Sequence, residues 1–241
     1  MPLQRTRLLP TARSAVSFNG VNQYVEVPTT VVTPGSTSLT VLAWASFNAI
    51  PYEVQMIVKQ GYGYVNGAYY IYTQYEKYYR AVLRGTDGVS ITLPGVVVYP
   101  STWYFLGLRY DGSEVSLWIN AEKRISASFS SPIGVNEPTR IGHPYGISGI
   151  YLNGLVSGVL IYSRALTGEE ILWNYYYPDN PVRNGLVLWL HYDTIDTANN
   201  KWYDKSGFGN HATLYNNPEK VDMLLPPKRT LSPTRTLTPT R

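Results

Sequence analysis

The chain of 241 residues is 44% hydrophobic and only 15% charged, which indicates a packed globular protein and excludes a largely disordered one. Because it contains no cysteine, a disulfide framework, a thiolate metal site and a cysteine nucleophile are all excluded. The net charge of +4 comes from the two ends: residues 1–13 and 224–241 hold seven of the 20 cations and no acid, so the body between them is mildly acidic.

The first 13 residues, "MPLQRTRLLPTAR", are interpreted as a basic N-terminal arm. They contain no apolar run long enough for the core of a signal peptide, and no segment of the chain reaches the ~20 apolar residues of a membrane span. We therefore predict no membrane span and no recognisable signal peptide, so that an extracellular or virion-surface location would have to be reached by another route.

From residue 14 onward the dominant hydrophobic period is two, which is typical of β-strands. In "SLTVLAWASF", residues 38–47, both alternating faces are fairly apolar, as expected for a central strand of stacked sheets. The sequence "DGS" at 111–113 predicts a β-hairpin between strands 103–110 and 114–120. Further strands are predicted at 14–19, 23–27, 55–60, 68–75, 79–85, 88–93, 123–129, 138–142 and 155–162. Strands so regularly spaced predict a sandwich.

One short helix is predicted after Leu166, because Thr167 and Glu170 have the spacing of a capping box and Pro178 ends the segment. The chain closes with a six-residue repeat, "RTLSPT" then "RTLTPT", within residues 224–241. Proline at this spacing forbids a helix. This Thr/Pro/Arg tail is expected to be either a flexible or polyproline-II linker or an extended arm that lies on a neighbouring molecule.

Five segments in order resemble the laminin-G-like, concanavalin A-like jelly-roll family: "AVSFNGVNQYVEVP", "SLTVLAWASF", "WYFLGLRYDGSEVSLWIN", "RIGHP" and "LNGLVSGVLIYSRALTGEEI". The resemblance implies an all-β, concanavalin A-like jelly-roll β-sandwich with one short helix and extended basic tails, with the sandwich at residues 14–178. The family is broad, and includes glycan-binding modules, adhesion domains and parts of surface proteins and virus particles.

Residues 179–223 resemble the opening of such a domain, with "GLVLWLHYD" and "DKSGFGNHATLYN", but they follow the body instead of preceding it. The displaced segment is expected to complete its own sandwich, to complete that of a neighbouring copy, or to begin a second domain. Donation between copies would join them through an otherwise unpaired edge. The candidate assembly residues are Trp189, Asp204, Asn210, His211, Leu214, Tyr215, Arg229 and Arg235.

No catalytic pattern is found. No two acids stand two residues apart, as the paired carboxylates of jelly-roll glycosidases do, and the three histidines have no metalloprotease spacing. We therefore predict a non-enzyme without a catalytic residue. The family resemblance raises calcium as a cofactor, with Asn19, Asn22 and Asp111 as weak candidates, but Ser157 stands where relatives often carry Asp, so no metal site is predicted.

Sugar rings pack on exposed aromatic faces, and residues 61–80 are rich in tyrosine. The candidate carbohydrate-binding residues are Tyr62, Tyr64, Tyr75, Tyr78 and Tyr79. Alternatively, tyrosines at alternate positions pack between sheets or brace subunits. Nucleic acid is not an expected partner, because the basic tails lack interleaved aromatic residues and the body is acidic.

The sequence favours a non-catalytic structural subunit of an extracellular filament or virus particle that self-assembles through its C-terminal segment and tails. The alternative is a monomeric carbohydrate-binding or cell-adhesion module, with surface glycans as partners. The two hypotheses differ in whether the tyrosines and tails are buried between copies.

Overall fold

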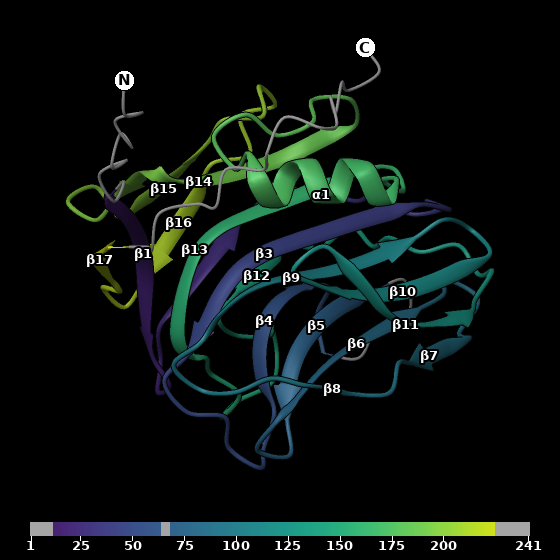
Figure 1. The fold of residues 1–241 in the computed structure, drawn as a ribbon, viewed down its shortest axis with the longest axis horizontal. Coiled ribbons are helices and arrows are strands. Elements are labelled where there is room, and N and C mark those ends of the chain that lie inside the picture. The colour runs from purple at the N-terminus through teal and green to yellow at the C-terminus, as the bar shows by residue number, and fades with distance from the viewer. Residues whose placement is uncertain (1–11, 64–67, 225–241) are drawn as a thin grey trace, which may run out of the picture.

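The structure, a computed structural model, describes residues 12–63 and 68–224. Its strand pairings form two antiparallel sheets that pack on each other (Figure 1). The first sheet has the order β11 (Glu122–Ser128), β10 (Glu114–Ile119), β9 (Trp103–Tyr110), β3 (Leu39–Phe47), β13 (Asn153–Tyr162), with β1 (Ala12–Asn19) and β14 (Leu186–Asp196) sharing the free edge of β13 and β17 (Glu219–Leu224) beside β1.

The second sheet has the order β15 (Lys201–Asp204), β16 (Ala212–Tyr215), β2 (Tyr24–Val27), β12 (Thr139–Ile141), β4 (Gln55–Gln60), β5 (Tyr69–Gln74), β6 (Tyr78–Arg84), with β7 (Ser90–Thr92) and β8 (Val96–Val97) both against β6. The predicted all-β jelly-roll sandwich with one short helix is confirmed. β8, β15 and β17 were not predicted, and in β8 two paired residues leave no detectable alternation.

The central strand β3 behaves as its sequence predicts. Leu39, Val41 and Phe47 face the main core between the sheets, whereas Leu42 and Trp44 face the opposite side. That second side is covered by α1 (Gly168–Tyr176), which lies along the outside of the first sheet (Figure 1). The strand is therefore apolar on both faces because a helix covers the face that would otherwise meet water.

Both predicted local signatures are present. Thr167 caps α1, with the Glu170 backbone N–H donating to its Oγ1 at 3.2 Å and the Thr167 N–H donating to the Glu170 carboxylate at 2.8 Å. In the hairpin, Asp111 Oδ1 accepts from the backbone N–H groups of Ser113 and Glu114 at 3.0 and 2.8 Å. Gly112 supplies the φ of +91° that the turn needs.

At nine residues α1 is far shorter than the ~20 that a bilayer requires. Residues 12–63 and 68–224 contain no longer apolar helix.

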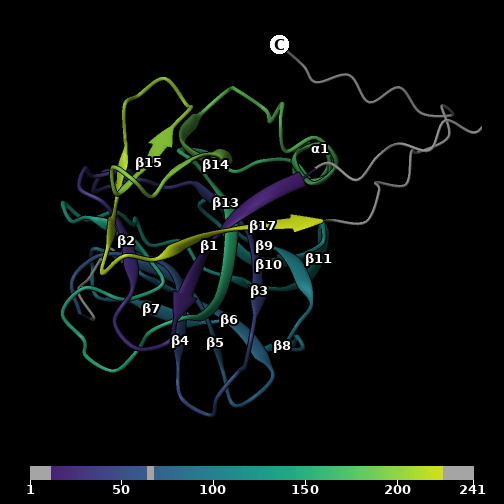
Figure 2. The same cartoon turned by 90° about the vertical axis from the view of Figure 1, so that its left-hand side faces the viewer.

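The displaced segment packs on its own chain. β14 pairs with β13, and β16 pairs with β2. β17 pairs with β1, and both lie toward the viewer in Figure 2. The last pairing extends β1 to Ala12, two residues before the predicted start, and Ser14 Oγ donates to Asp222 Oδ1 at 2.7 Å across it. The segment thus adds strands to both sheets of its own chain.

Asp204 holds the turn of this segment against β14. Its Oδ1 accepts from the backbone N–H groups of Trp189 at 2.8 Å and Ser206 at 2.9 Å, and its Oδ2 accepts from Ser206 Oγ at 2.7 Å and the Asn210 N–H at 2.9 Å. The Asp204 backbone N–H donates to His211 Nδ1 at 3.1 Å. A buried carboxylate that accepts four hydrogen bonds fixes the turn in one conformation.

The six described assembly candidates all make contacts within the chain. Trp189 and Leu214 are buried, Asp204 and His211 share the turn, Asn210 Nδ2 donates to the Val187 carbonyl at 2.8 Å, and Tyr215 stacks on Tyr24. These contacts account for the six residues without a second copy, and their role in assembly stays a prediction. Arg229 and Arg235 lie outside the described residues.

We expect Asp204→Ala to lower the free energy of unfolding by about 2–4 kcal/mol, because it leaves several buried backbone donors unpaired. Denaturant unfolding measures the change. Glu122→Ala serves as the control, since this carboxylate pairs only with Arg124 at the surface. Equal stability of the two variants would show that Asp204 does not hold the turn.

Candidate functional site

A row of paired residues crosses the outer face of the second sheet. The strand registers place Thr213, Glu26, Arg140, Lys59, Tyr70 and Val82 next to one another, from β16 to β6. Their sequence neighbours on the other side, such as Val25 and Ile141, belong to the main core. We call this outer surface the tyrosine face, because tyrosines and cations dominate it.

Five residues on the tyrosine face form the Arg140 row: Tyr62, Tyr145, Arg140, Tyr24 and Tyr215. The Arg140 guanidinium lies 4.2 Å from the ring centre of Tyr145 and 4.3 Å from that of Tyr24. Tyr24 stacks on Tyr215 at 4.6 Å with an interplanar angle of 8°. Arg140 Nε also donates to Glu26 at 2.7 Å, so its charge is neutralised within the row.

Tyr62 closes one end of the row. Its ring meets that of Tyr145 edge to face, with centroids 5.0 Å apart and planes at 69°. It lies against Gly146, where an added Cβ would come within 2.5 Å of the ring, so only glycine leaves room for this arrangement. With 48% of its surface exposed, Tyr62 presents a ring to solvent.

A second group, the Arg80 cluster, contains Tyr52, Tyr72, Tyr75, Tyr78 and Arg80. The Arg80 guanidinium lies 5.2 Å from the ring centre of Tyr75 and 5.7 Å from that of Tyr78. Tyr52, 64% exposed, meets Tyr75 edge to face at 5.0 Å. Because Tyr72 pairs with Arg80 and stands two residues from Tyr70, the cluster is on the same face as the Arg140 row.

Lys59 lies between the two groups. It is almost fully buried, donates to the Gly63 carbonyl and places its Nζ 4.8 Å from the Tyr70 ring centre. Burial, and secondarily the positive charge of Arg84, lowers the pKa of Lys59 to about 8. The tyrosine face therefore concentrates positive charge at Lys59, Arg80 and Arg84.

The five predicted carbohydrate-binding tyrosines have different fates. Tyr62 belongs to the Arg140 row, and Tyr75 and Tyr78 belong to the Arg80 cluster. The prediction for Tyr79 is wrong, because this residue is fully buried in the main core and cannot contact a ligand. Burial also raises the pKa of its hydroxyl. Tyr64 lies outside the described residues.

Sequence reasoning missed Tyr24, Tyr52, Tyr145, Arg80 and Arg140 as site residues. Period-two alternation carried the signal for three of them. Tyr24 alternates with the buried Val25, Arg140 with the buried Ile141, and Arg80 with the buried Tyr79 and Ala81. The same alternation assigns Tyr79 to the core. Tyr52 and Tyr145 stand in connections between strands, where no period exists.

The weak metal candidates form turns. Asn19 Oδ1 accepts from the Val21 and Asn22 N–H groups at 2.9 and 3.2 Å, and Asp111 caps the hairpin. Ser157, at the position where the family resemblance leads one to expect Asp, donates to the Ser14 carbonyl at 2.9 Å and joins β13 to β1. The described residues contain no group of three His, Asp or Glu side chains arranged to hold a metal ion.

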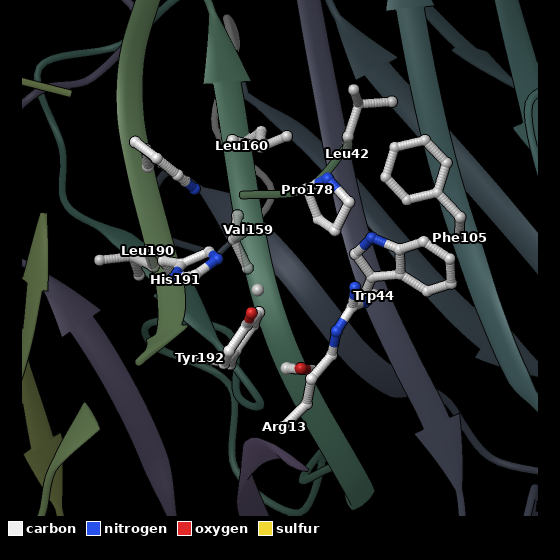
Figure 3. A pocket seen from close by; sticks show the side chains of 13 residues that line it. Arg13, Leu42, Trp44, Phe105, Val159, Leu160, Pro178, Leu190, His191 and Tyr192 are labelled. Atoms are coloured by element: carbon white, nitrogen blue, oxygen red, sulfur yellow. The ribbon is translucent and has the colours of Figure 1, made fainter. Parts of the chain in front are cut away.

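A hollow of about 330 Å³, which includes space open to solvent, lies on the outside of the first sheet near Pro178. Leu42, Trp44, Phe105 and Leu160 line it, and Arg13, His191 and Tyr192 stand at its side (Figure 3). This mainly apolar lining continues the packing under α1.

A charged cluster at this hollow joins β1, β14 and the loop after α1. His191 Nε2 lies 3.1 Å from Asp179 Oδ1, and its Nδ1 contacts Asp193. Hydrogen bonds from His191 and Tyr192, with the Arg13 charge, hold the pKa of Asp179 well below its usual range. Burial and the bond to Asp179 raise the pKa of Tyr192 to about 12.

Two antiparallel sheets in this order, with a helix on the outside of one sheet, define a concanavalin A-like jelly roll. Residues 19–172 match the laminin-G-type profile of the Concanavalin A-like lectin/glucanases superfamily, and the chain belongs to that superfamily. No functionally curated protein matches the sequence at a significant level.

Three solved structures are similar in fold. The first is a candidate carbohydrate-binding protein from Bacteroides ovatus ATCC 8483, with a TM-score of 0.66 and 18% identity over 88% of this chain and 60% of that one. A CBM40 domain of the Ruminococcus gnavus IT-sialidase, bound to α2,3-sialyllactose, has a TM-score of 0.51 and 14% identity over 68% and 97%. Domains LG4-5 of the mouse laminin α1 chain also have a TM-score of 0.51 and 14% identity, over 65% and 45%. The chain thus spans about three fifths of the Bacteroides protein.

Stability should fall in acid partly through Asp179. A carboxylate whose pKa is lowered by folding stabilises the fold above about pH 4, and this contribution is lost as the pH falls. Asp179→Asn should therefore flatten the loss of thermal stability between about pH 4 and pH 2. We expect Asp179 to contribute less than about 1 kcal/mol to the free energy of unfolding, because half of its side chain is exposed. Glu122→Gln is the control, and its thermal stability should depend on pH as that of the parent does. If the stability of Asp179→Asn followed the same pH dependence as these two proteins, this role of Asp179 would be contradicted.

Proposed function

We propose that the protein is a non-catalytic carbohydrate-binding module whose glycan ligand lies on the tyrosine face. The observation that carries the proposal is the set of tyrosine rings arranged around Arg140 and Arg80 on one face of the second sheet. Sugar C–H faces pack on aromatic rings, while hydroxyl and guanidinium groups beside the rings supply hydrogen bonds. The carbohydrate-binding proteins among the structural neighbours support this class of function.

The charge pairing at the Arg140 row supports binding over hydrolysis. A retaining glycosidase needs two carboxyl groups about 5 Å apart facing the sugar. Glu26, the carboxylate beside the row, instead accepts a hydrogen bond from Arg140 in an ion pair. An adhesive role outside the cell agrees with the laminin similarity and forms part of the proposal.

Assembly into a filament or virus particle remains a second hypothesis from the sequence. The comparisons favour the binding module, and the C-terminal segment makes its strand pairings within its own chain.

Screening the protein on a glycan array, followed by calorimetric titration of the best ligand, tests the proposal. Tyr52→Ala and Tyr62→Ala should each weaken binding roughly 3- to 10-fold, as expected for the loss of one stacking ring. Tyr177→Ala is the matched control, since this tyrosine is 43% exposed but follows α1 on the outside of the first sheet. Equal losses in all three variants, or no glycan bound at all, would refute the proposal.

A further inference from the structure

Arg80 is held in a fixed position on the tyrosine face. It pairs with Tyr72 across β5 and β6, and the Tyr72 hydroxyl is hydrogen-bonded to it. The rings of Tyr75 and Tyr78 lie beside the guanidinium at 5.2 and 5.7 Å. Contacts with three aromatic side chains restrict the rotamers of an otherwise flexible residue.

Arg80 differs from Arg140 in its charge environment. Arg140 donates to Glu26 at 2.7 Å, whereas no carboxylate of residues 12–63 or 68–224 lies within ion-pair distance of Arg80. The Arg80 Nε is buried, and none of the described groups accepts a hydrogen bond from it. The cluster thus holds a positioned cation whose charge no described carboxylate neutralises.

The surroundings add positive charge to this end of the face. Lys77 Nζ lies 5.4 Å from the Tyr78 ring centre, and Lys59 and Arg84 lie farther along the same sheet. The nearby acids, Glu53 and Glu76, are exposed and form no ion pair with Arg80. An anionic group that approaches the cluster would therefore meet a favourable field.

We infer that Arg80 makes the site selective for acidic glycans by binding a carboxylate or sulfate group of the sugar. The inference rests on the proposed function and names the class of sugar that the tyrosine face takes. A guanidinium presents a planar fork of N–H donors that matches a carboxylate or sulfate with two parallel hydrogen bonds. The rings of Tyr75 and Tyr78 flank the guanidinium, at 5.2 and 5.7 Å, and supply aromatic faces for the sugar that carries the anion.

The test uses short oligosaccharides in matched sets: lactose as the neutral parent, sialyllactose for a carboxylate and 3′-sulfolactose for a sulfate, within an array of further neutral and acidic pairs. The full chain should bind at least one acidic class about tenfold or more tightly than its neutral counterpart, and added salt should reduce this preference. The two acidic arms show which anion is recognised.

Arg80→Gln should abolish the preference for the acidic sugar, so that the variant binds the acidic sugar and its neutral counterpart with equal affinity. Arg80→Lys should keep part of the preference, because it keeps the charge but loses the fork. Arg124→Gln is the control: it removes the same charge from an exposed arginine on β11 of the first sheet and should change nothing. Unfolding curves of all three variants show whether each is folded.

Neutral and acidic sugars bound equally by the full chain would overturn the inference while the proposed function stands. Retention of the acidic preference in a folded Arg80→Gln variant would overturn it as well. Failure to bind any sugar, neutral or acidic, would overturn the proposed function and the inference with it.

Discussion

The fold depends on β14, because this strand belongs to both sheets. Its first half, Leu186 to His191, pairs with β13 of the first sheet, and its end, Ile195 and Asp196, pairs with β15 of the second. Leu188, Leu190 and Ile195 enter the main core from this strand, and Trp202 follows from β15. Asp204 then fixes the turn by binding the backbone of Trp189, so the two halves of the segment hold each other. One displaced segment thereby closes one side of the sandwich.

The tyrosine face depends on the same closure. β16 extends the second sheet beyond β2, and this places Tyr215 on Tyr24, which in turn packs on Arg140. The Arg140 row is therefore assembled from both ends of the sequence, although its members are adjacent in space. The Arg80 cluster, by contrast, comes from β5, β6, the turn between them and the connection from β3 to β4 that supplies Tyr52. The proposed glycan site thus joins a local element to a long-range one.

Local sequence patterns predicted the fold, whereas the site depends on contacts between residues, many of which are far apart in the sequence. Alternation predicted both faces of β3, and the Thr167 and Asp111 side chains predicted a helix start and a hairpin that the structure contains. The same alternation places Tyr79 in the core, so its place among the predicted binding residues is wrong. Arg140 is a site residue because its guanidinium packs on the rings of Tyr145 and Tyr24, and no spacing in the sequence predicts these contacts. The contact of His191 with Asp179 is not predictable from the sequence, since the approach of Asp179 depends on the path of the loop after α1.

We expect one chain to close its own sandwich with residues 179–223 and so to display the tyrosine face as a single unit. Light scattering of the full chain over a wide range of concentrations tests this most directly. The account predicts one molar mass, that of the 27.1 kDa monomer, at every concentration. A mass that rises to multimers, and that returns to the monomer when residues 179–223 are removed, would show that the segment joins neighbouring copies and would contradict the account.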